Sequence, residues 1–353
     1  MFRSSRKRPL LGLDVTTSSV KLLELSETAR GYRVESFAAE PTPANAINEK
    51  AIVDAEAVGE AIRRAVKRAG TKTQDAAVAI SGDAAITKVI QMPRNLSDAD
   101  LEGQVELQAD QYIPFPMEEV SFDFETIGES QRDPEMLDVL LVATRTENVE
   151  QRQAAVEAAG LTARVVDVEA FAVENACSLM THQMPDGGLE KFIAIVDFGA
   201  STTTFSVLHN LKVIYTRDFA FGGQQLTEEI MRTYGLSLED AGRAKKEGGL
   251  PSNYQPEVLD AFMDDMSQQV SRSLQFFLAS GTGRDQPDQV LVCGGCANIP
   301  GVADVIGSRI GISTEIGDPL GQMKLSSRAK AHGVQRDATA LLTACGLALR
   351  SFD

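Results

Sequence analysis

The chain has 353 residues, of which 43% are hydrophobic and 24% are charged, so it is long enough for about two domains with large cores. Its formal net charge of −16 argues against general binding to nucleic acid through neutralised phosphates. Four cysteines are too few for a disulfide framework, and three histidines leave few candidates for histidine-based catalysis. No apolar run approaches the roughly 18 residues of a membrane span, so we expect a soluble, cytoplasmic protein.

The first nine residues are basic, and the apolar stretch after them is too short for the core of a signal peptide. We expect residues 1–9 to form a flexible head. Such a head could touch anionic lipid, but a disordered, solubilising tail is the interpretation that we favour.

A strand, a tight polar turn and a second strand open the folded part of the chain. Residues 10–15 are apolar except for Asp14, residues 16–19 are all threonine or serine, and apolar residues dominate again at 20–25. A helix with apolar positions every four residues is expected before Gly70, which would end it. The pattern then predicts strands at 76–80, 86–92, 120–127, 137–143 and 163–168, with helices at 97–111 and 147–159.

A break at residues 184–188 separates a second half of similar composition. A nearly unbroken apolar strand at 192–197 ends in Asp197 and is followed by a turn rich in hydroxyl groups. The elements expected after it are strands at 205–208 and 213–217, helices at 224–234, 238–247 and 256–278, a buried strand at 289–292 and a last helix at 337–350.

The turn at Asp14 is repeated at Asp197. When the two aspartates are superposed, residues 17–19 fall on residues 200–202, and both turns lie between apolar strands. Backbone N–H groups and hydroxyls in such turns suit phosphate oxygens, and an aspartate can approach phosphate through Mg²⁺ and its retained waters. A single copy would more often be an ordinary β-turn. Two matched copies predict a polyphosphate clamped between two halves, with Lys21 as a further positive charge.

Two pairs of glycines support this site. One pair, Gly294 and Gly295, follows a buried strand, and the other, Gly222 and Gly223, precedes an expected helix. Glycine allows backbone to approach a ligand closely, and a helix N-terminus favours anions.

These features together resemble the superfamily of actin, sugar kinases and DnaK-type chaperones, and within it the PilM family of type IV pilus assembly. The resemblance covers nearly the whole chain beyond the basic head. Its most specific segments are residues 112–116 and 165–171, and residues 12–25 and 294–301 also match. It implies an α/β, actin-like ATPase fold, with two αβ domains around a nucleotide cleft and an inserted small subdomain of the FtsA and PilM type.

The resemblance implies that ATP and Mg²⁺ occupy the cleft. It assigns residues to a first phosphate loop (Asp14, Thr17, Ser18, Lys21), to a second phosphate loop (Asp197, Gly199, Ser201, Thr202), to the surroundings of the metal through water (Asp14, Glu169, Asp197), and to the ribose and adenine side (Gly222, Gly223, Lys245, Gly294, Gly295, Asn298). No residue could be assigned as the one that orients attacking water, so weak ATP hydrolysis stays open.

The resemblance also implies domain boundaries. After the head come the N-terminal part of the first domain (10–82), the inserted small subdomain (83–160), a return to the first domain (161–188), the second domain with its nucleoside-binding subdomain (189–335), and a C-terminal helix that packs on the first domain (336–353).

For partners, the resemblance implies that a groove beside the inserted subdomain receives the cytoplasmic N-terminal peptide of the inner-membrane protein PilN. Ile113, Pro114 and Phe115 are the candidate groove residues, with subdomain core as the alternative. Other pilus assembly components are expected partners, nucleic acid is not, and membrane contact is expected only through partners. The protein would then be cytoplasmic and peripheral at the inner membrane.

Three other functions stay open. A metabolite kinase of the same superfamily would need an acidic base over a substrate hydroxyl, and no candidate is evident. A structural scaffold with a vestigial site stays open because Thr16 and Gly242 stand where the family pattern has glycine and glutamate. An FtsA-like division protein would need an amphipathic helix after a C-terminal linker, which we do not expect in a chain that ends at Asp353.

Overall fold

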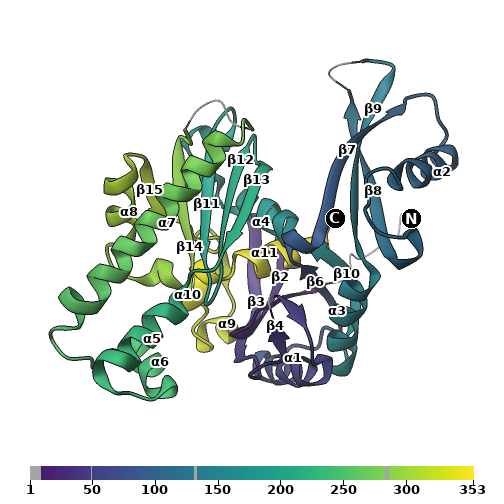
Figure 1. Cartoon of the computed structure of the whole chain (residues 1–353). Helices are drawn as coiled ribbons and strands as arrows, with labels where there is room; N and C mark the ends of the chain where they lie inside the picture. Colours follow the sequence, from purple (N-terminus) through teal and green to yellow (C-terminus); the bar gives the residue numbers. More distant parts are fainter. Residues whose placement is uncertain (1–8, 49, 131–132, 283–285) are drawn as a thin grey trace.

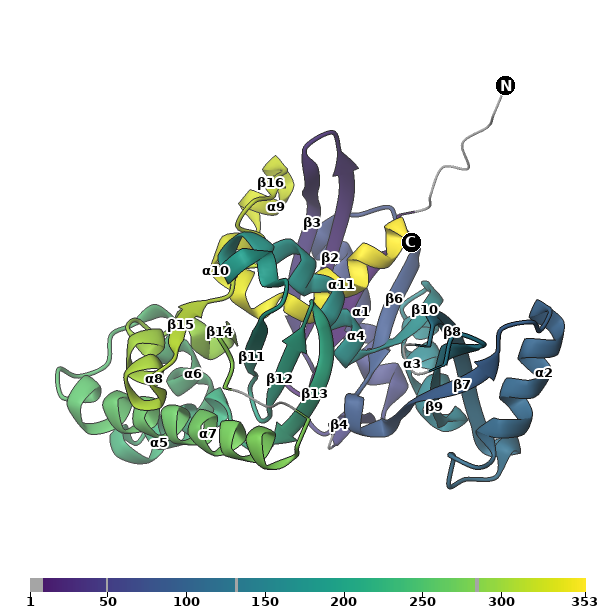
Figure 2. The same ribbon diagram turned by 90° about the horizontal axis from the view of Figure 1, so that it is seen from above.

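The computed structural model describes residues 9–48, 50–130, 133–282 and 286–353. The head expected at residues 1–9 therefore lies outside the described residues, except for Pro9. The described chain forms two α/β lobes side by side and a small subdomain that projects from the first lobe (Figure 1). Figure 2, a view from above, shows that this subdomain lies on the side of the first lobe away from the second.

The first lobe is built on a six-stranded sheet with the order β10-β6-β1-β2-β3-β16. Its central strand β1 is antiparallel to β2 and parallel to β6. The bounds are β1 (Leu11–Val15), β2 (Ser19–Thr28), β3 (Gly31–Pro41), β6 (Asp75–Ile80), β10 (Thr162–Val168) and β16 (Lys324–Leu325).

Helices cover both faces of this sheet, which is why its central strands are apolar on both sides. Leu22 packs in the core beneath α1 (Ala55–Ala69) and α3 (Thr146–Ala158), whereas its neighbour Leu23 packs in the core with α4 (Glu169–Cys177) and α11 (Leu342–Leu349). The helix expected before Gly70 is α1, with Gly70 in the left-handed conformation at its end.

The second lobe repeats this connectivity around a five-stranded sheet with the order β13-β12-β11-β14-β15. Like β1, the central strand β11 is antiparallel to the strand after it and parallel to its other neighbour. The strands are β11 (Phe192–Phe198), β12 (Thr203–His209), β13 (Lys212–Phe219), β14 (Gln289–Gly294) and β15 (Ser313–Ile316), and the helices are α5 (Gly223–Tyr234), α6 (Leu238–Glu247), α7 (Asp260–Ala279) and α8 (Val302–Ile310).

Two helices differ from the sequence prediction. The helix expected at 256–278 is regular only from Asp260, because a π-helical turn, Gln255–Leu259, precedes α7. The helix expected at 337–350 is wrong as a single element: α10 (Val334–Asp337) and α11 are separated by a 3₁₀ turn, Ala338–Ala340. Within this turn, the buried hydroxyl of Thr339 donates to the carbonyl of Gly294 at 3.0 Å, so the segment between the two helices contacts the second lobe.

The small subdomain is a three-stranded antiparallel sheet, β7-β9-β8, with α2 (Asp98–Ala109) and a core of its own. Its strands are β7 (Ala85–Pro93), β8 (Val120–Glu129) and β9 (Met136–Arg145). Helix α3 was expected inside the inserted segment 83–160, but Ala155 and Val156 of α3 pack in the core of the first lobe with α1. The part with a separate core therefore ends at about the end of β9.

The remaining short elements are β4 (Ile47–Asn48), β5 (Ala51–Ile52) and α9 (Ser327–Ala331).

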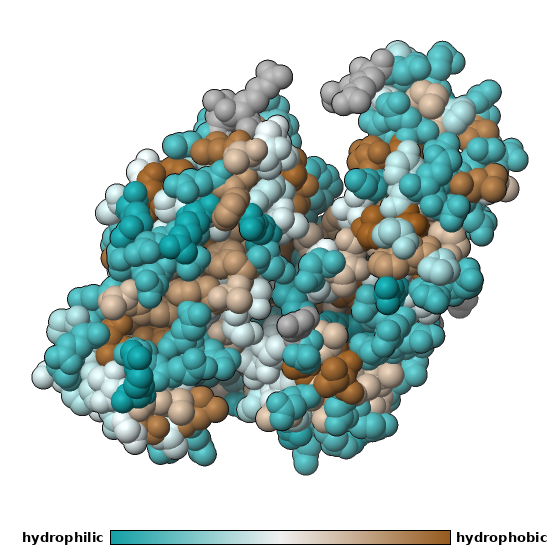
Figure 3. All heavy atoms as spheres, viewed as in Figure 1, coloured by the Kyte–Doolittle hydropathy of each residue, from teal (hydrophilic) through white to brown (hydrophobic). Residues whose placement is uncertain are grey.

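Within the described part of the chain, no helix is both long and apolar enough to span a membrane. On the face shown in Figure 3, apolar surface is broken into patches by hydrophilic residues, and a deep notch separates the second lobe from the small subdomain.

Candidate functional site

The two turns that follow Asp14 and Asp197 lie against each other between the lobes. The hydroxyl oxygens of Thr17 and Ser201 are 3.1 Å apart, although they come from different lobes. Asp14 is 7% exposed at the end of β1, and its Oδ2 lies 2.8 Å from Nζ of Lys21 on β2. The topology explains why the two turns meet. Each turn connects the two strands of the central hairpin of its own sheet, β1–β2 in the first lobe and β11–β12 in the second.

Charges from both lobes act on one another here. Burial is the main cause that raises the pKa of Asp197 to about 6; Lys21 opposes this shift and Asp14 adds to it. Burial is the largest single effect on Lys21 and lowers its pKa, but the attraction and hydrogen bond of Asp14, together with the charges of Asp197 and Asp337, outweigh it, so the net shift is upward. The two aspartates and Lys21 therefore form one electrostatic unit, with a proton on Asp197 that is held more tightly than on an ordinary aspartate.

Thr16 replaces the glycine of the family pattern without disturbing the first turn. Its hydroxyl accepts a hydrogen bond from the N–H of Ser19 at 3.2 Å and donates to the Ser19 carbonyl at 2.9 Å. Thr16 is not among the described residues with positive φ, so glycine is not needed at this position. In the second turn, the N–H of Gly199 donates to the carbonyl of Thr202 at 3.1 Å, and this closes a tight bend.

The glycines before α5 pack backbone on backbone. The N–H of Gly223 donates to the carbonyl of Gly199 at 3.0 Å, and a β-carbon on Gly222 would lie 2.6 Å from that same carbonyl oxygen. Lys245 on α6 donates to the carbonyl of Gly223 at 2.7 Å and to the hydroxyl of Thr227 at 2.6 Å, and burial lowers its pKa. These residues thus join the second turn to α5 and α6, and Lys245 already has two hydrogen-bond partners there.

The other glycine pair lies beside Asp197. Gly294 has φ +87°, and a β-carbon there would lie 2.5 Å from Oδ1 of Asp197. Gly295 and Asn298 are exposed, and the side-chain amide of Asn298 donates to the carbonyl of Arg336 at 3.2 Å. The strand end therefore needs glycine at 294, where a side chain would displace the aspartate.

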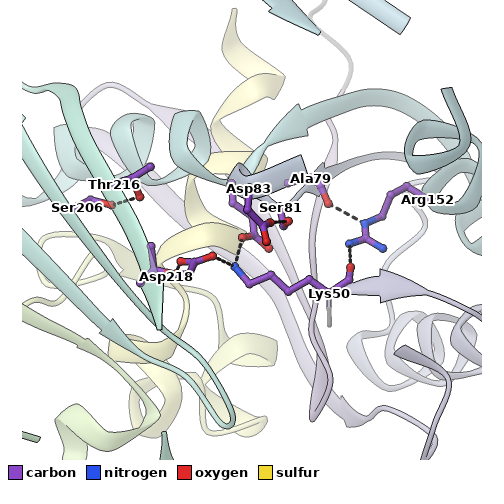
Figure 4. Close-up of polar contacts among 10 residues, drawn as sticks. Lys50, Ala79, Ser81, Asp83, Arg152, Ser206, Thr216 and Asp218 are labelled. Atoms are coloured by element: carbon purple, nitrogen blue, oxygen red, sulfur yellow. Dashed lines mark hydrogen bonds and ion pairs between the residues drawn. The ribbon is translucent and has the colours of Figure 1, made fainter. Parts of the chain in front are cut away.

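Lys50 joins the two lobes, although no pattern in the sequence points to it. Its Nζ lies 2.9 Å from Oε2 of Glu169, at the start of α4. The same Nζ lies 2.5 Å from Oδ2 of Asp218, on β13 (Figure 4). Burial raises the pKa of Glu169 in spite of Lys50, whereas the two carboxylates together raise the pKa of Lys50. No motif surrounds Lys50 in the sequence, so its partners become visible only when the lobes are assembled.

The donor set fits a hydrated metal ion better than a directly coordinated one. Among the described residues, no three His, Cys, Asp or Glu side chains are grouped to hold a metal directly. Asp14 and Glu169 are each engaged by a lysine, and the negative charge of Asp14 helps to raise the pKa of both Glu169 and Asp197, although burial is the main cause at each. Mg²⁺ commonly retains several waters and binds through phosphates, so this arrangement is compatible with Mg²⁺ carried by a nucleotide.

The candidate groove residues separate into two environments. Ile113 is 5% exposed and packs in the core of the small subdomain, which favours the core alternative over a contact in a partner groove. A proline on each side of Phe115 leaves that loop outside the sheet, but it does not keep Ile113 out of the core. Pro114 is exposed, and the half-buried ring of Phe115 lies beneath the guanidinium of Arg145, with its centroid 4.3 Å away.

Two lobes with equivalent central hairpins and a junction of paired turns define an actin-like ATPase fold, as the sequence predicts. The family of "Type IV pilus assembly protein PilM" matches residues 12–352. This chain belongs to the PilM family of type IV pilus assembly proteins.

Known proteins agree with this assignment. A solved structure of the PilM–PilN type IV pilus biogenesis complex contains a chain that is 26% identical, with a TM-score of 0.79 and coverage of 98% of this chain and 99% of that chain. The ethanolamine utilization protein EutJ from Carboxydothermus hydrogenoformans shares the fold, with 17% identity, a TM-score of 0.56 and coverage of 96% and 89%. The cell division protein FtsA of Enterococcus hirae is 22% identical over 354 residues, which cover 87% of this chain and 77% of FtsA. The family match supports pilus assembly over the metabolite kinase and cell-division alternatives.

Proposed function

We propose that this protein is an ATP-binding adaptor of the type IV pilus inner-membrane assembly platform. The observation that carries the nucleotide part is the contact between Thr17 and Ser201, because it brings two phosphate-binding turns from separate lobes to one point. Asp14, Lys21 and Asp197 lie directly behind these turns. The arrangement supplies hydroxyl donors, one ammonium group and two carboxylates, which is a suitable donor set for a triphosphate with Mg²⁺.

Each part of the site would have a separate task. Thr17, Ser18, Ser201 and Thr202 would donate to phosphate oxygens, and Lys21 would offset phosphate charge. The carboxylates of Asp14, Glu169 and Asp197 would accept from the waters around Mg²⁺, which when bound would neutralise the phosphates. Gly222, Gly223, Gly294, Gly295 and Asn298 would border the nucleoside, with Lys245 supporting them through Gly223.

The proposed partner is the cytoplasmic N-terminal peptide of PilN. Support comes from the similar chain in the PilM–PilN complex, which matches this protein over nearly its whole length. We place the groove beside the small subdomain, with Pro114 and Phe115 as candidate contacts. The protein would then lie in the cytoplasm at the inner membrane, held there by this and other pilus assembly partners.

Nucleotide and peptide binding would be coupled, because the first lobe contributes to both sites. The test is a pull-down of the protein by an immobilised PilN N-terminal peptide, with Mg-ATP and after nucleotide stripping, and with a scrambled peptide as control. We expect stronger retention with ATP and none on the scrambled peptide. Equal retention with and without ATP would contradict the proposed coupling. If calorimetry shows that the protein binds no ATP, it is instead a scaffold with a vestigial nucleotide site.

A further inference from the structure

Lys50 makes a shielded ionic bridge between the lobes. Its side chain and those of Glu169 and Asp218 are only 20% to 25% exposed, and the two carboxylates belong to different lobes. Shielded ion pairs of this kind are less weakened by water and salt than surface pairs. Removal of the lysine would leave Glu169 and Asp218 as two facing negative charges.

The surrounding structure holds both ends of this bridge in place. Lys50 has φ +70°, a left-handed conformation that is uncommon for residues other than glycine. Arg152, only 4% exposed, donates from Nε to the carbonyl of Ala79 at 2.9 Å and from Nη2 to the carbonyl of Lys50 at 2.7 Å (Figure 4). In the second lobe, the hydroxyl of Thr204 donates to Oδ1 of Asp218 at 2.6 Å. A strained backbone persists where its surroundings determine it, which indicates that Lys50 is positioned for this contact.

We propose that Lys50 is an ionic latch that holds the two lobes together in the protein without nucleotide, and that Arg152 is the residue that positions it. The inference rests on the proposed function in treating the space between the lobes as the nucleotide cleft. Glu169 is one of the carboxylates assigned to the water shell of Mg²⁺. The latch and the metal–nucleotide complex would therefore both bind the carboxylate of Glu169. Competition for this carboxylate would link the position of the lobes to nucleotide binding.

The test measures the distance between the lobes in the full chain, stripped of nucleotide. Spin labels at Lys67→Cys on α1 and Lys246→Cys on α6 report on this distance, because both positions are exposed and all four native cysteines are buried. We expect Lys50→Met to shift the pulsed electron paramagnetic resonance distance distribution to longer and broader values. Lys50→Arg, which keeps the positive charge, should restore most of the short-distance population.

Lys212 offers a matched control. Its Nζ lies 2.7 Å from Oε1 of Glu174, so it also joins β13 to α4, but its side chain is 77% exposed. Exposed ion pairs contribute little to stability. Without Lys212, Oε2 of Glu174 would still accept the hydrogen bond from the N–H of Val213, which is 2.8 Å long. Lys212→Met should therefore leave the distance distribution unchanged.

A second variant keeps the test decisive if Lys50→Met does not fold. Asp218→Ala removes the acceptor in the second lobe and leaves Lys50 paired with Glu169, so it should also lengthen the distance. Wild-type distributions in the folded variants would overturn the latch. Nucleotide affinity of the wild type is measured separately by calorimetry. A wild type that does not bind ATP overturns the proposed nucleotide function, whereas the distances in stripped protein still decide the latch.

Discussion

Thr17 and Ser201 are separated by 184 residues in the chain, yet their hydroxyl oxygens lie 3.1 Å apart. Each hydroxyl belongs to a turn that follows an aspartate at the end of the central strand of its sheet. A ligand that enters between these turns meets donors from both lobes at once. This relationship makes the function testable by changes on either side of the cleft.

Loss of either hydroxyl should weaken ATP binding. We expect Thr17→Val and Ser201→Ala each to reduce affinity about tenfold, because a hydrogen bond to a charged phosphate contributes about 1.5 kcal/mol or more. Titration calorimetry with Mg-ATP measures this. Thr28→Val is the control, since the Thr28 hydroxyl donates to Gly31 at the distant end of the β2–β3 hairpin. Wild-type affinity in both cleft variants would contradict the assignment of the turns.

Asp197→Asn should stabilise the protein at neutral pH while it weakens Mg-ATP binding. Burial raises the pKa of Asp197 to about 6, so its proton is bound more tightly in the folded than in the unfolded chain. The folded state is therefore destabilised as pH rises from the ordinary pKa of aspartate to the raised pKa of Asp197. Asparagine does not ionise, so the substitution removes this loss of stability. We expect the unfolding free energy of Asp197→Asn to exceed that of the wild type by about 2 kcal/mol above pH 6, and this difference should shrink to near zero below pH 4. Urea unfolding across this pH range measures it, and a gain that grows toward low pH would contradict the prediction.

Gly294→Ala should destabilise the second lobe. Its φ of +87° disfavours alanine, and the new β-carbon would collide with the backbone at Phe198 and with Asp197. We expect a loss of about 2 kcal/mol or more in unfolding free energy. The neighbouring substitution Gly295→Ala is the matched control, because a β-carbon there meets nothing within 4 Å. Equal effects of the two substitutions in denaturant unfolding would show that the strand end is not tightly constrained.

Ile113→Ala should destabilise the small subdomain rather than act on a partner alone. Ile113 is buried among the apolar residues of that subdomain, so truncation is expected to cost about 2 to 5 kcal/mol. Leu107→Ala, at a position on α2 that is 71% exposed, should change stability by less than about 0.5 kcal/mol. Hydrogen exchange of the β9 amides measures both. Unchanged protection in Ile113→Ala would restore this residue as a candidate for the partner groove.

Local patterns predicted much of the fold and part of the site. The apolar strand, the aspartate and the hydroxyl-rich turn are read from neighbouring residues, so both copies could be found at Asp14 and Asp197. The break before α11 could not be found, because no glycine or proline marks it in the sequence and the partner of Thr339 in the turn is Gly294 of the other lobe. The sequence could not decide between core and groove for Ile113 for a similar reason, since a loop next to prolines does not show which side chain fills the core beneath it.

Sequence alone predicted most of the strands and both hydroxyl-rich turns of this protein, because apolar periodicity and turn chemistry depend on residues near one another in the chain. Only the tertiary structure decided which of them meet. Lys50 reaches Glu169 and Asp218 across sequence separations of 119 and 168 residues, and no local signal records such a pairing. The bridge exists because the two lobes are packed so that the β4–β5 turn and the start of α4 in the first lobe face the edge strand β13 of the second.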